Sequence, residues 1–269
     1  MRRHGEVGVL PTGLVTALRQ LAGRPAVLLA FDLDGVLAPI VLDPADARPL
    51  PPSVAALHTL ARLPGTAVAL VSGRPLEQLR KLADPPPGAL LIGSHGAESD
   101  PPLDRVDILD DAARRLLGRV HAELGRIVAA HPGTRLEGKP TAAVLHTRGA
   151  GRTVAAAATQ QALQGPAGWT GVHPTLGKEV VELAVTDVTK GSALRLLRAA
   201  AGPAAGGVLY VGDDVTDERA FAVLDDDGGD VTVKVGPGDS LARHRVADPA
   251  AVARLLDLLA ALRSGCSAR

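Results

Sequence analysis

The sequence predicts an α/β fold in which a doubly wound parallel sheet, with helices on both faces, carries an inserted α+β domain. The first observation is that short apolar runs alternate with helix-like stretches, as buried parallel strands do. The second is that most of these runs end directly at a polar turn that contains glycine. The third is that, in the middle of the chain, the buried apolar runs give way to amphipathic segments. A length of 269 residues leaves room for both units.

The core strands are predicted at five apolar runs, which are residues 26–31, 67–71, 89–92, 208–211 and 231–235. Helix-like segments at 192–201 and 252–262 belong to the same core, and the proline clusters at 49–52 and 85–87 predict loops. Polar turns follow the first four strands at 32–35, 72–74, 93–96 and 212–214. Ligands of open α/β sheets bind beyond the carboxyl ends of the strands, so we expect these four turns to form one site.

The insertion is predicted between Asp104 and about Thr186, where the buried runs give way to amphipathic segments. It contains a long helix at 109–130, a strand at 142–147, a helix at 153–163 and a strand at 180–183. The prediction is therefore a discontinuous core of residues 1–103 and 187–269, with an α+β domain of residues 104–186.

Charge and composition exclude several classes of function. The chain has 29 basic and 29 acidic side chains without blocks of like charge, and its aromatic residues are two Phe, one Trp and one Tyr. Nucleic-acid binding depends on basic surfaces and stacking aromatics, so no nucleic-acid partner is expected. The apolar run at 26–31 is too short to cross a membrane. We expect a small-molecule substrate and no membrane partner, and nothing indicates the oligomeric state.

The single cysteine, Cys266, excludes an intramolecular disulfide and fits a reducing compartment. The N-terminus meets Gly5, Glu6 and Pro11 before any long apolar run, which is unlike a secretory signal. Both observations favour the cytoplasm.

Two carboxylates, Asp32 and Asp34, lie two positions apart at the end of the first strand, and Gly35 follows them. This spacing brings both acids to the carboxyl edge of the sheet, and the glycine lets the backbone turn. The alternative is a turn with two solvated acids. A calcium loop is excluded, because residues 36–40 are apolar where further ligands are needed.

A second acidic cluster follows the fourth strand, where Asp213, Asp214, Asp217 and Glu218 lie within six positions. Such dense negative charge is costly unless a cation compensates it. Oxygen ligands without nearby histidine or cysteine favour Mg²⁺ as the cofactor. The alternative is an acidic N-terminus on a helix at 216–223.

Two further residues fit phosphate chemistry by their positions. Lys190 precedes Gly191 at the start of a helix-like segment, where its ammonium could meet a phosphate and the carboxylates around it. The hydroxyl of Ser72, at a strand-to-helix turn, could bind phosphoryl oxygens. The alternatives are a solvated lysine and an ordinary helix cap.

Taken in order, four motifs resemble those of the haloacid dehalogenase superfamily: Asp32-Leu33-Asp34-Gly35, Ser72-Gly73-Arg74, Lys190-Gly191 and Gly212-Asp213-Asp214 with Asp217. The insertion resembles the C2-type cap of that superfamily, on a core that is Rossmann-like. Further segments resemble the trehalose-6-phosphate phosphatase family, namely 93–98, 137–139, 146–148, 177–182 and 212–218. The resemblance covers roughly residues 24 to 262.

The resemblance implies a phosphatase that passes through an aspartyl phosphate on Asp32, with Asp34 as general acid and base. Ser72 and Lys190 would stabilise the phosphoryl oxygens. Mg²⁺ would be held by Asp32, the backbone carbonyl of Asp34, Asp213 and Asp214, with Asp217 in or just behind that ligand set. Implied substrate contacts are Gly73, Arg74, His95, Gly96 and Glu98 of the core, and Glu137, Lys139, His146, Arg148, Lys178 and Glu182 of the cap.

The implied reaction is hydrolysis of trehalose 6-phosphate to trehalose and phosphate, as in trehalose biosynthesis. Within the same class, a sucrose-phosphate or mannosyl-phosphoglycerate phosphatase is the alternative, and a phosphomutase is a more distant one. A protein of another class, a phosphate-binding module without turnover, would be expected to lose one of the groups Asp32, Asp34, Ser72, Lys190 or Asp213. All five are present.

Overall fold

The computed structural model describes residues 9–102, 109, 111–201 and 205–267. The chain divides into two compact units, a core unit of Met1–Leu103 with Thr189–Arg269 and an inserted unit of Asp104–Val188. The predicted boundary between residues 103 and 104 lies outside the described part of the chain. None of the described helices is both long enough and apolar enough to cross a membrane.

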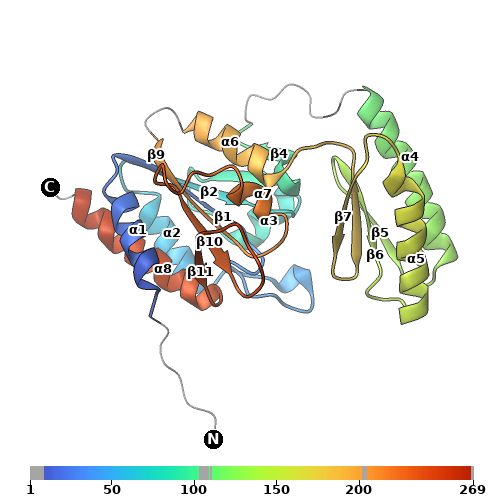
Figure 1. The fold of residues 1–269 in the computed structure, drawn as a ribbon, viewed down its shortest axis with the longest axis horizontal. Coiled ribbons are helices and arrows are strands. Elements are labelled where there is room, and N and C mark those ends of the chain that lie inside the picture. Colours follow the sequence, from blue (N-terminus) through green and yellow to red (C-terminus); the bar gives the residue numbers. More distant parts are fainter. Residues whose placement is uncertain (1–8, 103–108, 110, 202–204, 268–269) are drawn as a thin grey trace, which may run out of the picture. The chain divides into compact units, whose positions relative to one another are not determined.

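The core unit contains a seven-stranded sheet in the order β11-β10-β9-β1-β2-β3-β4 (Figure 1). All neighbours are parallel except β3 and β4. The predicted α/β class is therefore confirmed. The strands are β1 (Ala26–Phe31), β2 (Thr66–Val71), β3 (Leu90–Gly93), β4 (Glu98–Asp100), β9 (Ala205–Gly212), β10 (Val231–Val235) and β11 (His244–Val246).

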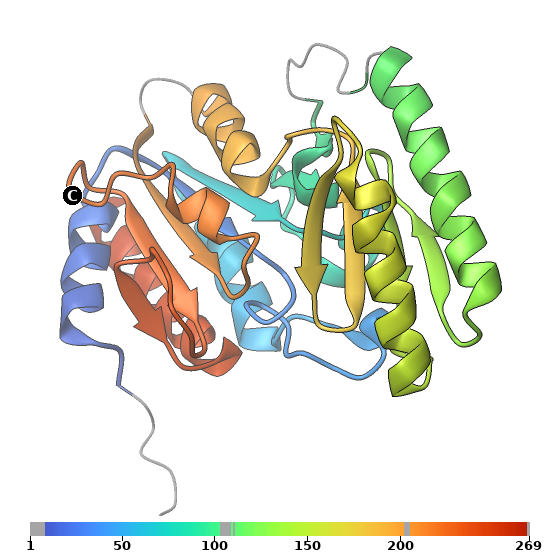
Figure 2. The ribbon, with the colours of Figure 1, turned by 45° about the vertical axis from the view of Figure 1, so that its right-hand side comes forward.

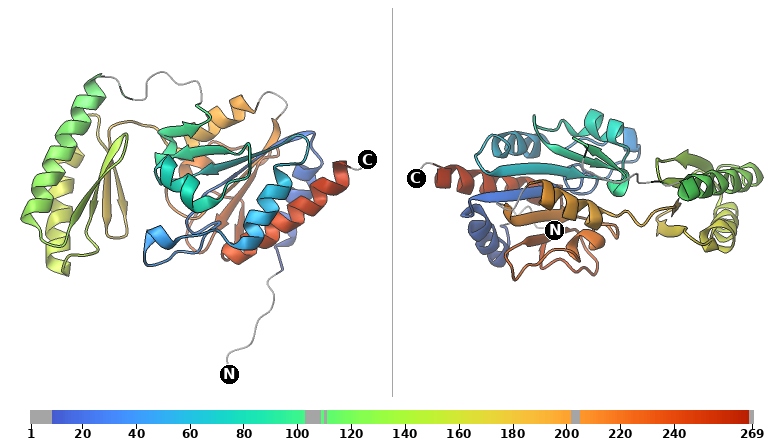
Figure 3. Two further views of the ribbon diagram at one scale, coloured as in Figure 1. Left: turned by 180° about the vertical axis from the view of Figure 1, so that it is seen from behind. Right: turned by 90° about the horizontal axis from the view of Figure 1, so that it is seen from above.

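Helices cover both faces of this sheet, because the strands are apolar on both sides (Figure 3). On β1, Leu29 and Phe31 belong to one buried cluster, while Leu28 and Ala30 belong to the other, as the alternation of a strand requires. The first cluster packs under α1 (Thr12–Ala22), α2 (Pro51–Leu60), α3 (Leu76–Ala83) and α8 (Pro249–Ser267). The second packs under α6 (Lys190–Ala200) and α7 (Glu218–Phe221).

One loop prediction is wrong in part. Residues 49–52 were expected to form a loop, but Pro51 and Pro52 open α2. Proline suits the first turn of a helix, because the amide hydrogen that it lacks has no acceptor there and its φ angle is already helical. The other cluster, at 85–87, lies between α3 and β3 and outside any helix or strand.

The topology fixes where the site lies. From β1 the chain order runs through β2 and β3 in one direction, and through β9, β10 and β11 in the other. The order reverses between β1 and β9, which pair in parallel with Phe31 opposite Val211. A ligand site is expected at such a switch point, beyond the carboxyl ends of the two strands. The acids at positions 32 and 213 follow there.

The inserted unit is a four-stranded antiparallel sheet with helices on one face (Figure 2). Ala143, Leu145, Val181 and Leu183 point to that face and pack with Leu124 and other apolar residues of the helices. The elements are α4 (Asp111–Ala130), β5 (Arg135–Gly138), β6 (Ala142–His146), α5 (Arg152–Gln164), β7 (His173–Gly177) and β8 (Val180–Ala184), with the sheet in the order β5-β6-β8-β7.

Candidate active site

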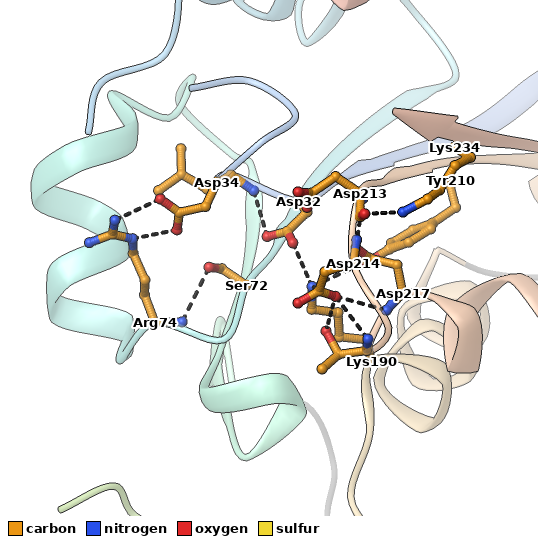
Figure 4. Close-up of polar contacts among 12 residues, drawn as sticks. Asp32, Asp34, Ser72, Arg74, Lys190, Tyr210, Asp213, Asp214, Asp217 and Lys234 are labelled. Carbon is orange, nitrogen blue, oxygen red and sulfur yellow. Dashed lines mark hydrogen bonds and ion pairs between the residues drawn. The ribbon is translucent and has the colours of Figure 1, made fainter. Parts of the chain in front are cut away.

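Asp32 lies at the centre of the core site, immediately beyond β1 (Figure 4). Its backbone amide continues the pairing of β1 with β9 by donating to the carbonyl of Val211 at 3.0 Å. Its side chain is 7% exposed. Oδ1 accepts the amide of Leu33 at 2.6 Å, and Oδ2 accepts the ammonium of Lys190 at 2.6 Å. The carboxylate is thus held in place by its own turn and by α6.

Lys190 is the first residue of α6 and is 1% exposed. Thr189 caps this helix, because its hydroxyl accepts the amide of Ser192 while the hydroxyl of Ser192 accepts the amide of Thr189. Burial alone would lower the pKa of Lys190, but the carboxylates of Asp32, Asp217 and Asp214 raise it above its ordinary value. The lysine is therefore a fixed positive charge beside Asp32.

Asp217 organises the turn that follows β9. Its Oδ1 accepts Lys190 at 2.8 Å and the hydroxyl of Tyr210 at 2.7 Å, and its Oδ2 accepts the amides of Asp213 and Asp214 at 2.8 and 3.0 Å. The side chain is fully buried. With both oxygens engaged in this way, Asp217 acts on the site by shaping the backbone that presents Asp213 and Asp214.

The other two acids of this turn differ in their electrostatics. Burial, with Asp214 and Asp217 close by, raises the pKa of Asp213 to about 7. Burial would also raise the pKa of Asp214, but the ammonium of Lys190 and two hydrogen bonds from Thr216 lower it to about 2. Asp214 thus caps the turn before α7, which is much shorter than the helix considered at 216–223. Asp214 is therefore firmly ionised, whereas the charge on Asp213 is costly unless a cation compensates it.

The donor set fits a hard divalent cation. Among the described residues, carboxylate oxygens of Asp32, Asp213 and Asp217 lie within 4.8 Å of one another. Burial, with Asp217 and Asp214 close by, raises the pKa of Asp32 well above its ordinary value, although Lys190 opposes this, so an ionised Asp32 is costly here. A cation would relieve that cost. Within this group both oxygens of Asp217 are saturated by hydrogen bonds, so Asp32 and Asp213 are the members that can turn to a metal. Asp214 is not in this group.

Gly35 makes the approach of these two turns possible. Its φ angle of 73° lies in the left-handed region, and a Cβ atom there would be 2.0 Å from Oδ2 of Asp213. A side chain at this position would displace the Asp213 carboxylate. Gly35 therefore allows the β1 turn to bend and lets Asp213 lie against it.

The second turn, after β2, carries Ser72 and Arg74. Ser72 is buried, and its hydroxyl accepts the amide of Arg74 at 3.2 Å. The helix that follows begins only at Leu76, with Pro75 as its N-cap residue, so Ser72 does not cap the helix itself. Nε and Nη2 of Arg74 each donate to one oxygen of Asp34, both at 2.6 Å.

The third turn, at 93–98, is fastened to the second. The amides of Ser94 and His95 donate to the carbonyls of Arg74 and Ser72 at 2.8 and 3.0 Å. His95 has a φ angle of 57°. Its ring packs against Gly73, because a Cβ atom built on Gly73 would lie only 2.4 Å from Cε1 of the His95 ring. Oε2 of Glu98 accepts the hydroxyl of Ser94 at 2.6 Å and the amide of Leu76 at 3.1 Å. Gly96 lies in the short turn between β3 and β4, with a φ angle of 119°.

The predicted residues of the insertion occupy the sheet of the inserted unit. Glu137 and Glu182 both lie opposite Val144 on neighbouring strands, on the face away from α4 and α5. Polar contacts form there or at the nearby hairpin. Glu137 is hydrogen-bonded to His146 at 2.7 Å and lies 3.7 Å from Arg135, and ion pairs join Lys139 with Glu182 at 2.6 Å and Arg148 with Glu179 at 3.3 Å. Hydrogen bonding to His146 lowers the pKa of Glu137. Lys178 is exposed in the turn between β7 and β8.

Sequence reasoning missed two buried polar residues that contact the acidic turn. Tyr210 lies on β9 and donates to Asp217, and Lys234 lies on β10 and donates to the carbonyl of Asp213. Both are embedded in apolar strand sequence, which is interpreted as core. The signal that could have found them is the polar side chain itself, since a buried lysine or tyrosine in a central strand needs a partner.

Comparisons with known proteins identify the family of this chain. The trehalose-phosphatase family model matches residues 30–253. The trehalose-phosphate phosphatase of Mycobacterium avium (strain 104) is 37% identical over 235 residues, which cover 82% of this chain and 56% of that protein. The trehalose-6-phosphate phosphatase of Escherichia coli (strain K12) is 35% identical over 226 residues, which cover 81% of this chain and 80% of that protein.

Among solved structures, the C-terminal domain of the C. albicans trehalose-6-phosphate phosphatase has a TM-score of 0.77 at 23% identity, covering 94% of this chain and 98% of that one. This likeness shows the fold. The chain spans about half the length of the M. avium relative, at 56%, and most of the E. coli protein, at 80%. The match of the family model and the identity to these relatives confirm the predicted family: this chain belongs to the trehalose-phosphatase family.

Proposed function

We propose that this chain is a magnesium-dependent phosphatase that hydrolyses trehalose 6-phosphate through an aspartyl phosphate on Asp32. The observation that carries the proposal is the arrangement at the switch between β1 and β9. There, a buried carboxylate with a lysine ammonium on one oxygen lies within 4.8 Å of the carboxylate of Asp213. A phosphoryl-transfer site needs a nucleophile and fixed positive charge around the phosphoryl oxygens, and these residues provide both.

Asp32 and Asp213 are the proposed carboxylate ligands of the metal, joined by the backbone carbonyl of Asp34. Asp214 lies outside the group of close carboxylates and is proposed as a further ligand, because its hydrogen bonds to the turn are made through Oδ1. When bound, Mg²⁺ supplies positive charge that offsets the carboxylates and polarises the phosphoryl group. Lys190 adds a second positive charge through its bond to Oδ2 of Asp32. It stays charged, because the carboxylates around it raise its pKa.

In the first half-reaction an oxygen of Asp32 forms a bond to phosphorus as the bond to the sugar oxygen breaks. Asp34 gives its proton to that departing oxygen. In the second half-reaction water attacks the phosphorus, its proton passes to Asp34, and the bond to Asp32 breaks. The same group serves as acid and then as base, which regenerates the starting state. Ser72 and Lys190 hold the phosphoryl oxygens as charge spreads over them.

The sugar assignment rests on the relatives and on the polar face of the inserted sheet. Disaccharides are rich in hydroxyl groups, which are recognised by charged and amide side chains that donate and accept hydrogen bonds. The pairs Glu137–His146 and Lys139–Glu182 offer such groups on one face, with Lys178 and Arg148 at its hairpin end. We propose this unit as the cap that selects the sugar, in a cytoplasmic enzyme whose partner is a small sugar phosphate.

The test is phosphate release by the purified full chain with a panel of sugar phosphates in the presence of Mg²⁺. Trehalose 6-phosphate should give the highest kcat/KM, above sucrose 6-phosphate, mannosyl-phosphoglycerate and glucose 6-phosphate. Asp32→Asn should abolish release from every substrate while the protein stays folded by circular dichroism. Asp227→Asn, which changes an exposed acid of the same unit, is the matched control and should be fully active.

Preference for another sugar phosphate would overturn the substrate assignment but would not contradict the aspartyl-phosphate mechanism. Near-normal turnover by Asp32→Asn would overturn the chemistry itself.

A further inference from the structure

The geometry assigns a role in the first half-reaction to Arg74. We propose that it is a positioning residue that orients the carboxyl group of Asp34, which donates its proton when protonated, instead of a group that binds the sugar phosphate. Its guanidinium makes two short parallel bonds, one to each oxygen of Asp34. A bidentate pair fixes the plane of the carboxylate as well as its position. This inference rests on the proposed phosphatase mechanism.

The pair is shielded from water on the arginine side. The Arg74 side chain is 11% exposed and that of Asp34 33% exposed. Asp34 therefore keeps an open side while its other side is held. Figure 4 shows the Asp34 carboxylate directed towards Arg74, while that of Asp32 is directed towards Lys190. The two acids of the motif are held by different cations.

Arg74 is in turn held by the backbone around it. Its amide donates to the Ser72 hydroxyl, and its carbonyl accepts the amide of Ser94. Glu98 accepts both the hydroxyl of Ser94 and the amide of Leu76, so it ties the β3–β4 turn to the start of α3. The guanidinium thus projects from a turn that is fastened on both sides.

The pairing leaves Asp34 able to act. A carboxylate has about four lone-pair sites, so one bond to each oxygen does not occupy it fully. What the pairing removes is rotation of the carboxyl group. A proton donor must lie within hydrogen-bond reach of the departing oxygen, so loss of orientation should weaken proton transfer.

This role predicts dependence on the leaving group. A sugar alkoxide departs only if it is protonated, whereas the 4-nitrophenolate ion departs without a proton. The parameter to measure is kcat/KM, because it reports the steps up to the first release of alcohol or phenol. Arg74→Gln should lower kcat/KM for trehalose 6-phosphate by about 100-fold, within the range of general-acid effects. The loss for 4-nitrophenyl phosphate should stay below about 5-fold.

Two more variants separate geometry from charge and from damage to the fold. Arg74→Lys keeps the positive charge but cannot make two parallel bonds to the carboxyl group. It should therefore show most of the same selective loss of kcat/KM for trehalose 6-phosphate. Arg80→Gln breaks an exposed pair between α3 and Asp100, and should act on both substrates like the wild type. In an Asp34→Asn background, Arg74→Gln should change the sugar phosphate kcat/KM by less than about 2-fold, because Arg74 acts through Asp34.

Several outcomes would overturn the inference. One is that Arg74→Gln lowers kcat/KM equally for both substrates. Another is that inorganic phosphate inhibits Arg74→Gln more weakly than the wild type. A third is that Arg74→Gln causes its full loss of kcat/KM in the Asp34→Asn background as well. Each would mean that Arg74 binds the phosphoryl group. Higher activity in Arg74→Gln would mean that the pair holds Asp34 away from its task. Failure of the proposed phosphatase chemistry is distinct, because there the wild type would release no phosphate from either substrate.

Discussion

Gly35 illustrates how residue-level constraints build the site. This residue follows Asp34 and has a left-handed φ angle. Because it has no side chain, the Asp213 carboxylate can occupy the space beside it. Gly88 provides a matched comparison, because its φ angle is 81° but no atom lies within 4 Å of a Cβ placed there. The two glycines share the backbone strain that a side chain would bring and differ in the contact with the acidic turn.

We predict that Gly35→Ala and Gly88→Ala both lower the free energy of unfolding, by about 1–2 kcal/mol each from the left-handed conformation. Only Gly35→Ala should reduce kcat, by about 100-fold, because a displacement of about 1 Å at a catalytic group has that effect. Chemical unfolding curves and steady-state kinetics measure the two quantities. If Gly88→Ala lost as much activity, the effect of Gly35 would be one of stability, and the contact with Asp213 would play no part.

At the scale of elements, the sequence predicts buried segments well and exposed ones poorly. The runs expected at 26–31 and 231–235 match β1 and β10, and the expected helix at 153–163 matches α5 within a residue or two. Strand β7 was missed, because it is exposed along its whole length and contains Pro174, so no apolar alternation marks it. Its partner β8 holds it in the sheet. Strand β11 is three residues long and was missed for lack of length.

The site follows the same logic. Asp32, Asp213 and Lys190 could be predicted, because each follows a recognisable strand or opens a recognisable helix, and the topology brings such ends together. The pairing of Arg74 with Asp34 could not, since the direction of a side chain within a turn depends on the neighbouring turn that holds it. The contacts of Tyr210 and Lys234 with the acidic turn were not predicted either, because both residues lie within runs that are interpreted as buried strands.

The link between β5 and β6 predicts a dependence of stability on pH. Hydrogen bonding to His146 lowers the pKa of Glu137 below its ordinary value of about 4.5. A depressed carboxyl pKa stabilises the fold above the unfolded pKa, and this stabilisation is lost as the pH falls through the folded pKa. The pair is partly exposed, so its contribution should be below about 1 kcal/mol.

We therefore expect Glu137→Gln to be less stable than the wild type near pH 7 and to approach it as the pH falls below about 4. Urea unfolding at a series of pH values measures the difference. In a His146→Gln background the pH-dependent difference should shrink but not vanish, because Lys139 and Arg135 also lower the pKa of Glu137. A gap that widens towards acid would show that the sign of the shift is wrong.

At the scale of the whole molecule, the proposed metal connects distant parts of the sequence. Asp32 and Asp213 come from segments on either side of the insertion, and β1 and β9 bring them together. The described residues of the inserted unit contribute no carboxylate to this group. A ligand that binds only the assembled site stabilises the unit that contains it, so the core unit should gain stability from the metal.

Mg²⁺ at about 100 times its Kd should stabilise the core unit by about 2.7 kcal/mol, which raises Tm by about 5–10 °C for a domain of this size. Asp213→Asn should abolish this rise. Its Tm without metal should equal or exceed that of the wild type, because the raised pKa of Asp213 shows that its buried charge opposes folding. Asp227→Asn, at an acid that is 84% exposed, should keep the full rise. Calorimetric scans with chelator and with Mg²⁺ measure all three proteins, and a full rise in Asp213→Asn would place the metal away from the β1–β9 switch.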